Sequence, residues 1–194
     1  MATVNRESAN WRLFGGGGLI VGGLLWLIGQ VLTLVLASVS VVPPFVVAVG
    51  ILVIAIALFF VAFGETGSNG AVGASLFGKI VLVALGAGWV IFSVLQVTAA
   101  IGLSSPVALN YAAGILVIAG GVLSTFAIYE RGVARGAARW VLAVPTVISI
   151  AWVIIAFGWI DVSFTPIDTI VGLVLSLAYA ATGVLYLLNR KDVG

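Results

Sequence analysis

The chain contains six apolar stretches, each long enough to cross a bilayer, and together they fill most of its 194 residues. A transmembrane helix needs roughly 20 apolar residues, because each residue adds about 1.5 Å and the hydrocarbon core is about 30 Å thick. Continuous aliphatic runs favour helices over the alternating strands of a membrane barrel. The sequence therefore predicts an all-α, polytopic membrane protein with a single membrane domain over residues 1–194. The expected spans are 13–37, 45–63, 80–101, 108–129, 140–160 and 167–188.

Composition supports this class. Hydrophobic residues make up 63% of the chain and charged residues 7%, whereas a typical soluble domain has roughly 45–50% and about 25%. The first apolar stretch follows Arg6 and Arg12 and continues from Leu13 to about Ala37. Because the apolar core of a signal peptide has only roughly 7–15 residues, we expect this stretch to be a retained first helix.

Several kinds of chemistry are excluded by residues that the chain lacks. It has no Cys and no His, so thiolate chemistry, imidazole catalysis and the common zinc and haem ligand sets are ruled out. The expected spans carry no ionisable residue at mid-depth, where such a residue would indicate a functional site. The eight basic residues form no continuous patch that would bind nucleic acid. We therefore expect no enzymatic activity, no catalytic residue, no cofactor and no metal, and as partners the lipid bilayer together with either another membrane protein or further copies of this chain.

The basic residues indicate an orientation. They all fall in segments on one side of the expected spans, whereas the three connections near 38–44, 102–107 and 159–167 have none. By the positive-inside rule, the sequence predicts a bacterial cytoplasmic (inner) membrane protein with both termini in the cytoplasm. The basic residues are Arg6, Arg12, Lys79, Arg131, Arg135, Arg139, Arg190 and Lys191. Arg131, Arg135 and Arg139 are four residues apart and, if helical, would face anionic lipid headgroups from one side.

An internal repeat with a step of about 63 residues organises the chain. The aromatic markers are Trp26, Trp89 and Trp152, and also Phe14, Phe77 and Trp140. The hexapeptide Gly50-Ile-Leu-Val-Ile-Ala55 recurs as Gly114-Ile-Leu-Val-Ile-Ala119. These spacings predict three tandem helical hairpins, over approximately 11–66, 76–131 and 138–191, related by a pseudo-threefold axis along the membrane normal. We expect the three deep tryptophans to pack near that axis.

Glycine is concentrated in the first span. The run Gly15–Gly18 with Gly22 and Gly23 includes the spacing Gly18-x-x-x-Gly22, which places two glycines on one helix face. Small residues allow helices to approach closely in a bilayer. These faces either pack within one chain or form a dimer contact.

Polar residues inside the spans form the candidate site. They are Gln30, Thr33, Ser93 and Gln96, with Asn110 and Tyr111 near the outer end of the fourth span. The 63-residue step aligns Gln30 with Ser93 and Thr33 with Gln96, so the polar groups of two hairpins lie at similar depth. This cluster either lines a polar vestibule that opens to the outside or forms hydrogen bonds between helices, each worth roughly 0.6 kcal/mol and at most about 2.

Three features lie at or near span ends. Trp11, Trp140 and Trp159 are placed as interfacial anchors are. Pro145 falls about one turn inside the fifth span, where it would kink the helix. The glycine-rich segment Gly64–Gly73 is typical of a flexible linker.

Some of these motifs point to a family. Trp11-Arg-Leu-Phe, the two copies of Gly-Ile-Leu-Val-Ile-Ala and Trp140-Val-Leu, in a chain with six spans and Pro in its short outer turns, resemble the HdeD-like family of bacterial membrane proteins. That family is associated with acid-stress resistance and has no established catalytic residues. The resemblance implies a non-enzymatic protein with a structural, stress-related or complex-stabilising role. The alternative is a channel or facilitator for a small neutral solute, with Gln30 and Gln96 at its mouth.

Overall fold

The computed structural model describes residues 11–36, 42–64, 70–131, 134, 136–156 and 167–188. Its helices are η1 (Arg12–Gly16, π-helical), α1 (Gly17–Leu36), α2 (Val42–Phe63), α3 (Leu76–Ala100), α4 (Val107–Arg131), η2 (Gly136–Arg139, 3-10), α5 (Ala143–Ala156) and α6 (Ile167–Leu188). With η1 joined to α1 and η2 to α5, they form six segments long and apolar enough to span a membrane. The prediction of an all-α protein with six candidate spans is confirmed.

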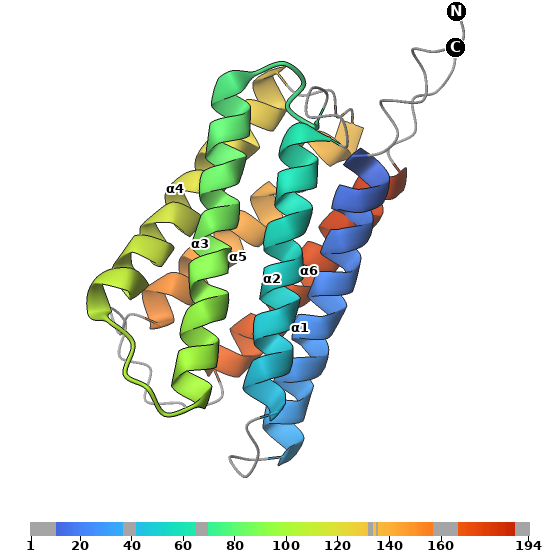
Figure 1. The fold of residues 1–194 in the computed structure, drawn as a ribbon. Helices are drawn as coiled ribbons and strands as arrows, with labels where there is room; N and C mark the ends of the chain where they lie inside the picture. The colour runs from blue at the N-terminus through green and yellow to red at the C-terminus, as the bar shows by residue number, and fades with distance from the viewer. Residues whose placement is uncertain are drawn as a thin grey trace, which may run out of the picture.

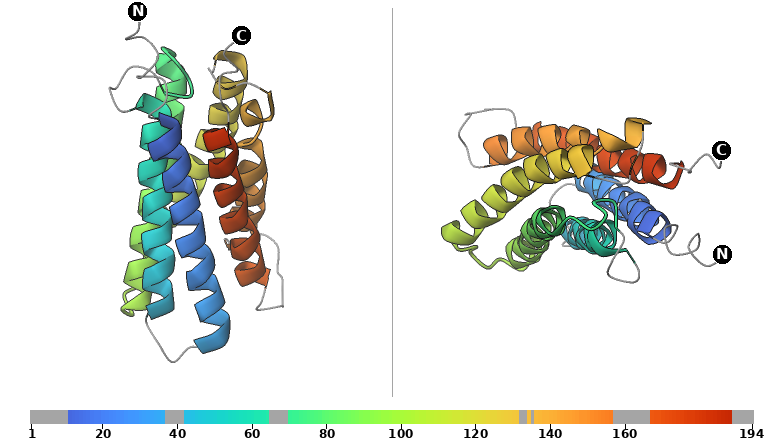
Figure 2. Two further views of the ribbon diagram at one scale, coloured as in Figure 1. Left: turned by 90° about the vertical axis from the view of Figure 1, so that its right-hand side faces the viewer. Right: turned by 90° about the horizontal axis from the view of Figure 1, so that it is seen from above.

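The six helices form a closed bundle. Each helix packs on the next along the chain, and α6 packs on α1. Figure 1 shows α1, α2 and α3 side by side with α5 and α6 behind them, and Figure 2 shows the same two groups from the side and from above. Because successive helices alternate in direction, Arg12, Lys79 and Arg139 share one end of the bundle, called here the basic end. The far end holds the start of α2, the turn between α3 and α4, and the start of α6.

The outer surface is apolar along the length of the helices. On α1, for example, Val21 and Ile28 are about half exposed, at 53% and 50%. Exposed aliphatic side chains of this kind would be costly in water and are at no disadvantage against lipid tails. The six apolar helices therefore imply contact with a lipid bilayer.

Glycines bring α1 close to both of its neighbours. A Cβ atom on Gly22 would meet the Gly50 carbonyl of α2 at 2.8 Å, and one on Gly23 would meet the Ala180 nitrogen of α6 at 2.8 Å. These contacts are too short for a side chain, so the backbones touch because the residues are glycine. This confirms that the glycine-rich faces pack within one chain.

The start of α5 differs from expectation. The predicted span began at residue 140, whereas α5 begins at Ala143, so Pro145 lies in the first turn. A first-turn N–H has no helical partner, and Pro is tolerated there without a kink. The three arginines do not lie along one helix either, because α4 ends at Arg131 and Gly136 has a left-handed φ of 57°. Arg135 lies outside the described residues.

The glycine-rich connection is only partly described, and the described part is packed. Ala71 and Val72 have no exposed surface, and the Ala71 N–H donates to the Val61 carbonyl at 2.7 Å. The expectation of a flexible linker is therefore wrong for Gly70–Gly73, since an apolar pair anchors it to the end of α2. Residues 65–69 lie outside the described range.

The tryptophans at the span ends behave differently from one another. Trp140 is 53% exposed and packs on Tyr129 with ring centroids 4.1 Å apart, as an interfacial anchor can. Trp11 is only 1% exposed and contacts Tyr186 edge to face at 5.5 Å. The expected anchor role is wrong for Trp11, because α6 covers it. Trp159 is not among the residues that the structure describes.

Candidate functional site

Three tryptophans meet in the middle of the bundle. Trp26 of α1, Trp89 of α3 and Trp152 of α5 have ring centroids 5.4, 6.3 and 6.1 Å apart, taken pairwise. Trp26 and Trp89 have no exposed surface, and Trp152 is 8% exposed. The expectation that these residues pack together is confirmed. Their rings fill the space between the helices, and we call them the tryptophan triangle.

Tyr179 of α6 ties this triangle to the other helices. The Trp89 Nε1–H donates to the Tyr179 hydroxyl at 2.8 Å, and Ser149 of α5 lies near that hydroxyl. Ser149 in turn donates from Oγ to the Pro145 carbonyl at 2.6 Å. The Trp89–Tyr179 hydrogen bond therefore links α3 and α6 in the apolar core. Among the described residues, the buried Trp26 Nε1 has no such partner.

A polar pocket lies at the far end, against Trp152. Its volume is about 210 Å³. Of its described lining side chains, five are polar and three are apolar. The lining residues are Gln30 and Thr33 of α1, Pro44 and Val47 of α2, Gln96 of α3, Trp152 of α5, and Asp168 and Thr169 of α6.

Helix geometry explains why the two glutamines meet there. Gln30 follows Trp26 by four residues and Gln96 follows Trp89 by seven, so each lies on the same helix face as a triangle tryptophan, nearer the far end. Gly172 of α6 makes room for Gln30, because a Cβ atom at that position would clash with the carboxamide. Asp168 precedes Gly172 by one turn, which brings its carboxylate to the same side of α6.

The structure brings together half of the polar residues singled out from the sequence. Gln30, Thr33 and Gln96 line the pocket, although the Thr33 hydroxyl also donates to the Gly29 carbonyl of its own helix at 2.9 Å. Ser93 instead donates to the Ala48 carbonyl of α2 at 2.8 Å and so links two helices. Three of the residues therefore line a pocket, whereas Ser93 makes a hydrogen bond between helices.

The other two sequence candidates do not line this pocket. Asn110 and Tyr111 are on α4 near the far end, with Asn110 half-buried and Tyr111 43% exposed. Conversely, sequence reasoning did not connect Asp168 or Thr169 with the glutamines. Asp168 was visible as an acidic residue at an outer span boundary, but nothing in the pattern showed that α6 would pack against α1.

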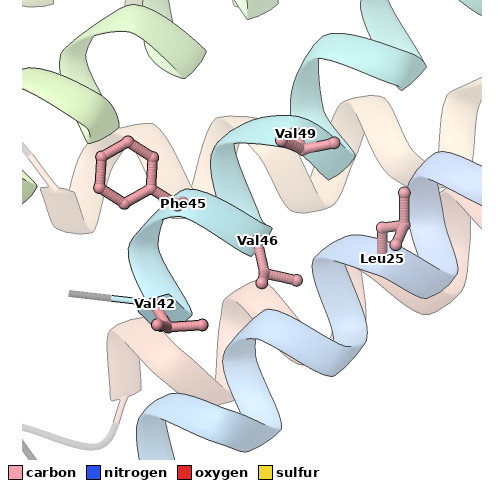
Figure 3. Close-up of a pocket in the computed structure, with 5 residues that line it drawn as sticks. All are labelled: Leu25, Val42, Phe45, Val46 and Val49. Atoms are coloured by element: carbon pink, nitrogen blue, oxygen red, sulfur yellow. The ribbon is translucent and has the colours of Figure 1, made fainter. Parts of the chain in front are cut away.

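Two further hollows lie on the outer side of α1 and α2 and are almost wholly apolar. One, of about 350 Å³, is lined by Leu25, Val42, Phe45, Val46 and Val49, which Figure 3 shows between the two helices. The other, of about 410 Å³, lies nearer the basic end, beside Phe14 and Phe60. Linings of this kind suit lipid tails and offer little to orient a polar solute.

At the basic end, Arg139 is held by the protein itself. Its Nη2 donates to the Tyr129 carbonyl at 2.7 Å, and the guanidinium carbon lies 5.1 Å from the centre of the Tyr129 ring. A cation at the last turn of a helix is favoured by the helix dipole. Arg139 thus stabilises the end of α4. The Arg131 side chain and Arg135 lie outside the described part of the structure.

Together, the fold and the pocket define a membrane protein with six transmembrane-length helices around an aromatic core. Comparison with known protein families, with curated proteins and with solved structures finds no match for this chain.

Proposed function

We propose that this chain is a non-enzymatic protein of the bacterial inner membrane, of HdeD-like type, with a structural, stress-related or complex-stabilising role. The observation that carries this proposal is the filled centre of the bundle. Trp26, Trp89 and Tyr179 are at most 1% exposed and occupy the space between the helices that a solute path would need. A bundle closed in this way is suited to a stable scaffold.

The proposal includes a topology. The three deep tryptophans come from α1, α3 and α5, the first helices of three successive hairpins, and their mutual contact supports a triplicated hairpin around a pseudo-threefold axis. The basic residues at one end support a cytoplasmic location for that end and for both termini.

The second candidate is a facilitator for a small neutral solute, and the polar pocket favours it. Gln30 and Gln96, from two different hairpins, both line that pocket. Carboxamides both donate and accept hydrogen bonds, which suits an uncharged polar solute. For passage, the tryptophan triangle would have to open.

Two measurements, survival in acid and swelling of liposomes, distinguish the scaffold from the facilitator. A strain lacking the gene is complemented with the wild-type chain or with the double variant Gln30→Leu, Gln96→Leu, and survival in acid is measured. The scaffold role predicts that deletion lowers survival and that both chains restore it equally. The purified proteins are also reconstituted in liposomes, where solute-driven swelling reports flux.

The outcomes separate the two candidates. A scaffold gives no swelling above that of empty liposomes for glycerol or urea. Swelling that the wild type supports and the double variant loses would establish the facilitator and end the scaffold proposal. A deletion strain with unchanged acid survival would remove the stress-related role.

A further inference from the structure

We propose that the polar pocket at the far end is a binding site for a small organic cation, namely an alkylammonium ion with a short hydrocarbon part. This inference goes beyond the proposed function, and it holds whether or not anything passes through the bundle. It follows from the charge, the hydrogen-bonding groups and the apolar wall that the pocket combines.

The charge of the pocket is negative. Among the residues that the structure describes, Asp168 is the one ionisable residue in its lining, and no described Lys or Arg contributes to it. The carboxylate is on α6, while the cations Arg12, Lys79 and Arg139 are at the other end of the bundle. The start of a helix favours an anion, and Asp168 in the first turn of α6 already supplies one. An added anion would therefore be repelled, and a cation attracted.

The polar groups match an ammonium head. Its three N–H groups need acceptors, and the pocket offers the carboxylate, two carboxamide oxygens and two threonine hydroxyls. Within the part of the chain that the structure describes, the side chains of Gln30, Gln96 and Asp168 make no hydrogen bond to protein. These acceptors are therefore free to turn toward a ligand, and a charge-assisted bond to the carboxylate would be the strongest of them.

The remaining wall suits a hydrocarbon part. Pro44, Val47 and Trp152 line it, and an aromatic ring also attracts an ammonium group. The volume of about 210 Å³ is far larger than a bare metal ion requires, since one water takes up about 30 Å³. Size and lining together point to an organic cation rather than to an inorganic one.

The test uses the full chain in discs of uncharged phosphatidylcholine, so that the lipid does not concentrate the cation. The probe is n-butylammonium, with n-butanol and butyrate as neutral and anionic counterparts of the same length. Binding is followed by tryptophan fluorescence, because Trp152 lines the pocket, and by calorimetry. Saturable binding is expected for the ammonium ion, with affinity at least roughly tenfold above that of the alcohol and none for butyrate.

Matched variants locate the site. Asp168→Asn removes the charge at nearly constant shape and should weaken binding roughly tenfold or more. Glu130→Gln is the same change at the basic end and should leave binding intact. Gln96→Leu should weaken binding, whereas Asn110→Leu, a similar change outside the pocket at the far end, should not.

Three results would overturn the proposal. They are equal affinity for the ammonium ion and the alcohol, the absence of saturable ammonium binding to the wild type, and undiminished binding by Asp168→Asn. If Asp168→Asn fails to fold, as judged by circular dichroism and gel filtration, Gln96→Leu decides the matter against Asn110→Leu. None of these outcomes bears on the scaffold role, which acid survival and liposome swelling test separately.

Discussion

Trp26 and Trp89 are two fully buried indoles that differ in their hydrogen bonding. The Trp89 Nε1–H donates to Tyr179, and that of Trp26 has no partner among the described residues. We expect Trp89→Phe to lower the free energy of unfolding by roughly 1 kcal/mol more than Trp26→Phe does. Both changes remove similar volume from the same contact, so the difference isolates the hydrogen bond. Denaturation in sodium dodecyl sulfate, followed by circular dichroism, measures both values.

The Tyr179→Phe background provides the control for this comparison. Without the tyrosine hydroxyl, Trp89 has no acceptor there, and the difference between the two Trp→Phe variants should disappear. Equal destabilisation of the two variants in the wild-type background would contradict the role given to the Trp89–Tyr179 bond.

For single residues, the sequence predicted which tryptophans contact one another better than it predicted which side chains are buried. The 63-residue step correctly indicated that Trp26, Trp89 and Trp152 would pack together, because equal spacing puts them at equal depth on related helices. The same reasoning failed for Trp11, since its position at a span end does not show that α6 covers it. Asp168 was likewise missed as a neighbour of Gln30, because that contact depends on Gly172 and on the packing of α6 against α1.

Glycine determines how the first helix fits between its neighbours. Gly22 and Gly17 lie on the same helix, but a Cβ atom on Gly22 would meet backbone atoms of α2 at 2.8 Å, and one on Gly17 would meet nothing within 4 Å. We expect Gly22→Ala to lower the free energy of unfolding by roughly 1–3 kcal/mol, because backbone cannot yield as a flexible side chain does. Gly17→Ala should cause no loss, since Ala is the better helix former.

The comparison of the two variants in the same denaturation assay tests this packing. Similar stability of Gly22→Ala and Gly17→Ala would mean that α1 does not approach α2 as closely as the structure has it. A stable Gly22→Ala protein with altered mass in gel filtration would instead indicate that this face contacts a second chain.

Element boundaries were predictable where hydropathy changes sharply and less so elsewhere. The predicted span began at residue 80, directly after the charged Lys79, yet the helix begins at Leu76 and Ser75 caps it by accepting from the Gly78 N–H at 3.1 Å. A lysine in the first turn of a spanning helix extends its ammonium group toward the interface, so its charge does not mark the helix end. The start of α5 was misplaced for the opposite reason, because the apolar residues from Trp140 onward continue the hydropathy signal through a turn.

At the scale of the whole molecule, the number of spans follows from sequence, whereas the closure of the ring does not. The sequence has six apolar segments of about 20 residues, each long enough for one membrane crossing. The structure has the same number of candidate spans among its described residues. The contact of α6 with α1 depends on small residues that meet across the interface, such as Gly183 against Gly16. A single sequence does not show which small residues meet across an interface, because each glycine alone is compatible with several neighbouring helices.

The proposed orientation gives a prediction for the intact molecule. The chain has no cysteine, so single-cysteine variants can be labelled without background. Ser104→Cys places a thiol in the exposed turn between α3 and α4 at the far end, and Ala137→Cys places one on exposed η2 at the basic end. If the basic end is cytoplasmic, a membrane-impermeant maleimide added to spheroplasts should label Ser104→Cys at once and Ala137→Cys only after permeabilisation.

The reverse pattern would place the basic end outside and would contradict the orientation. Labelling of both positions in intact spheroplasts would contradict the topology itself. Ser104 and Ala137 are separated by α4 alone, so exposure on the same side would mean that α4 does not cross the bilayer. The labelling experiment therefore tests both which end of the bundle is cytoplasmic and whether α4 crosses the bilayer.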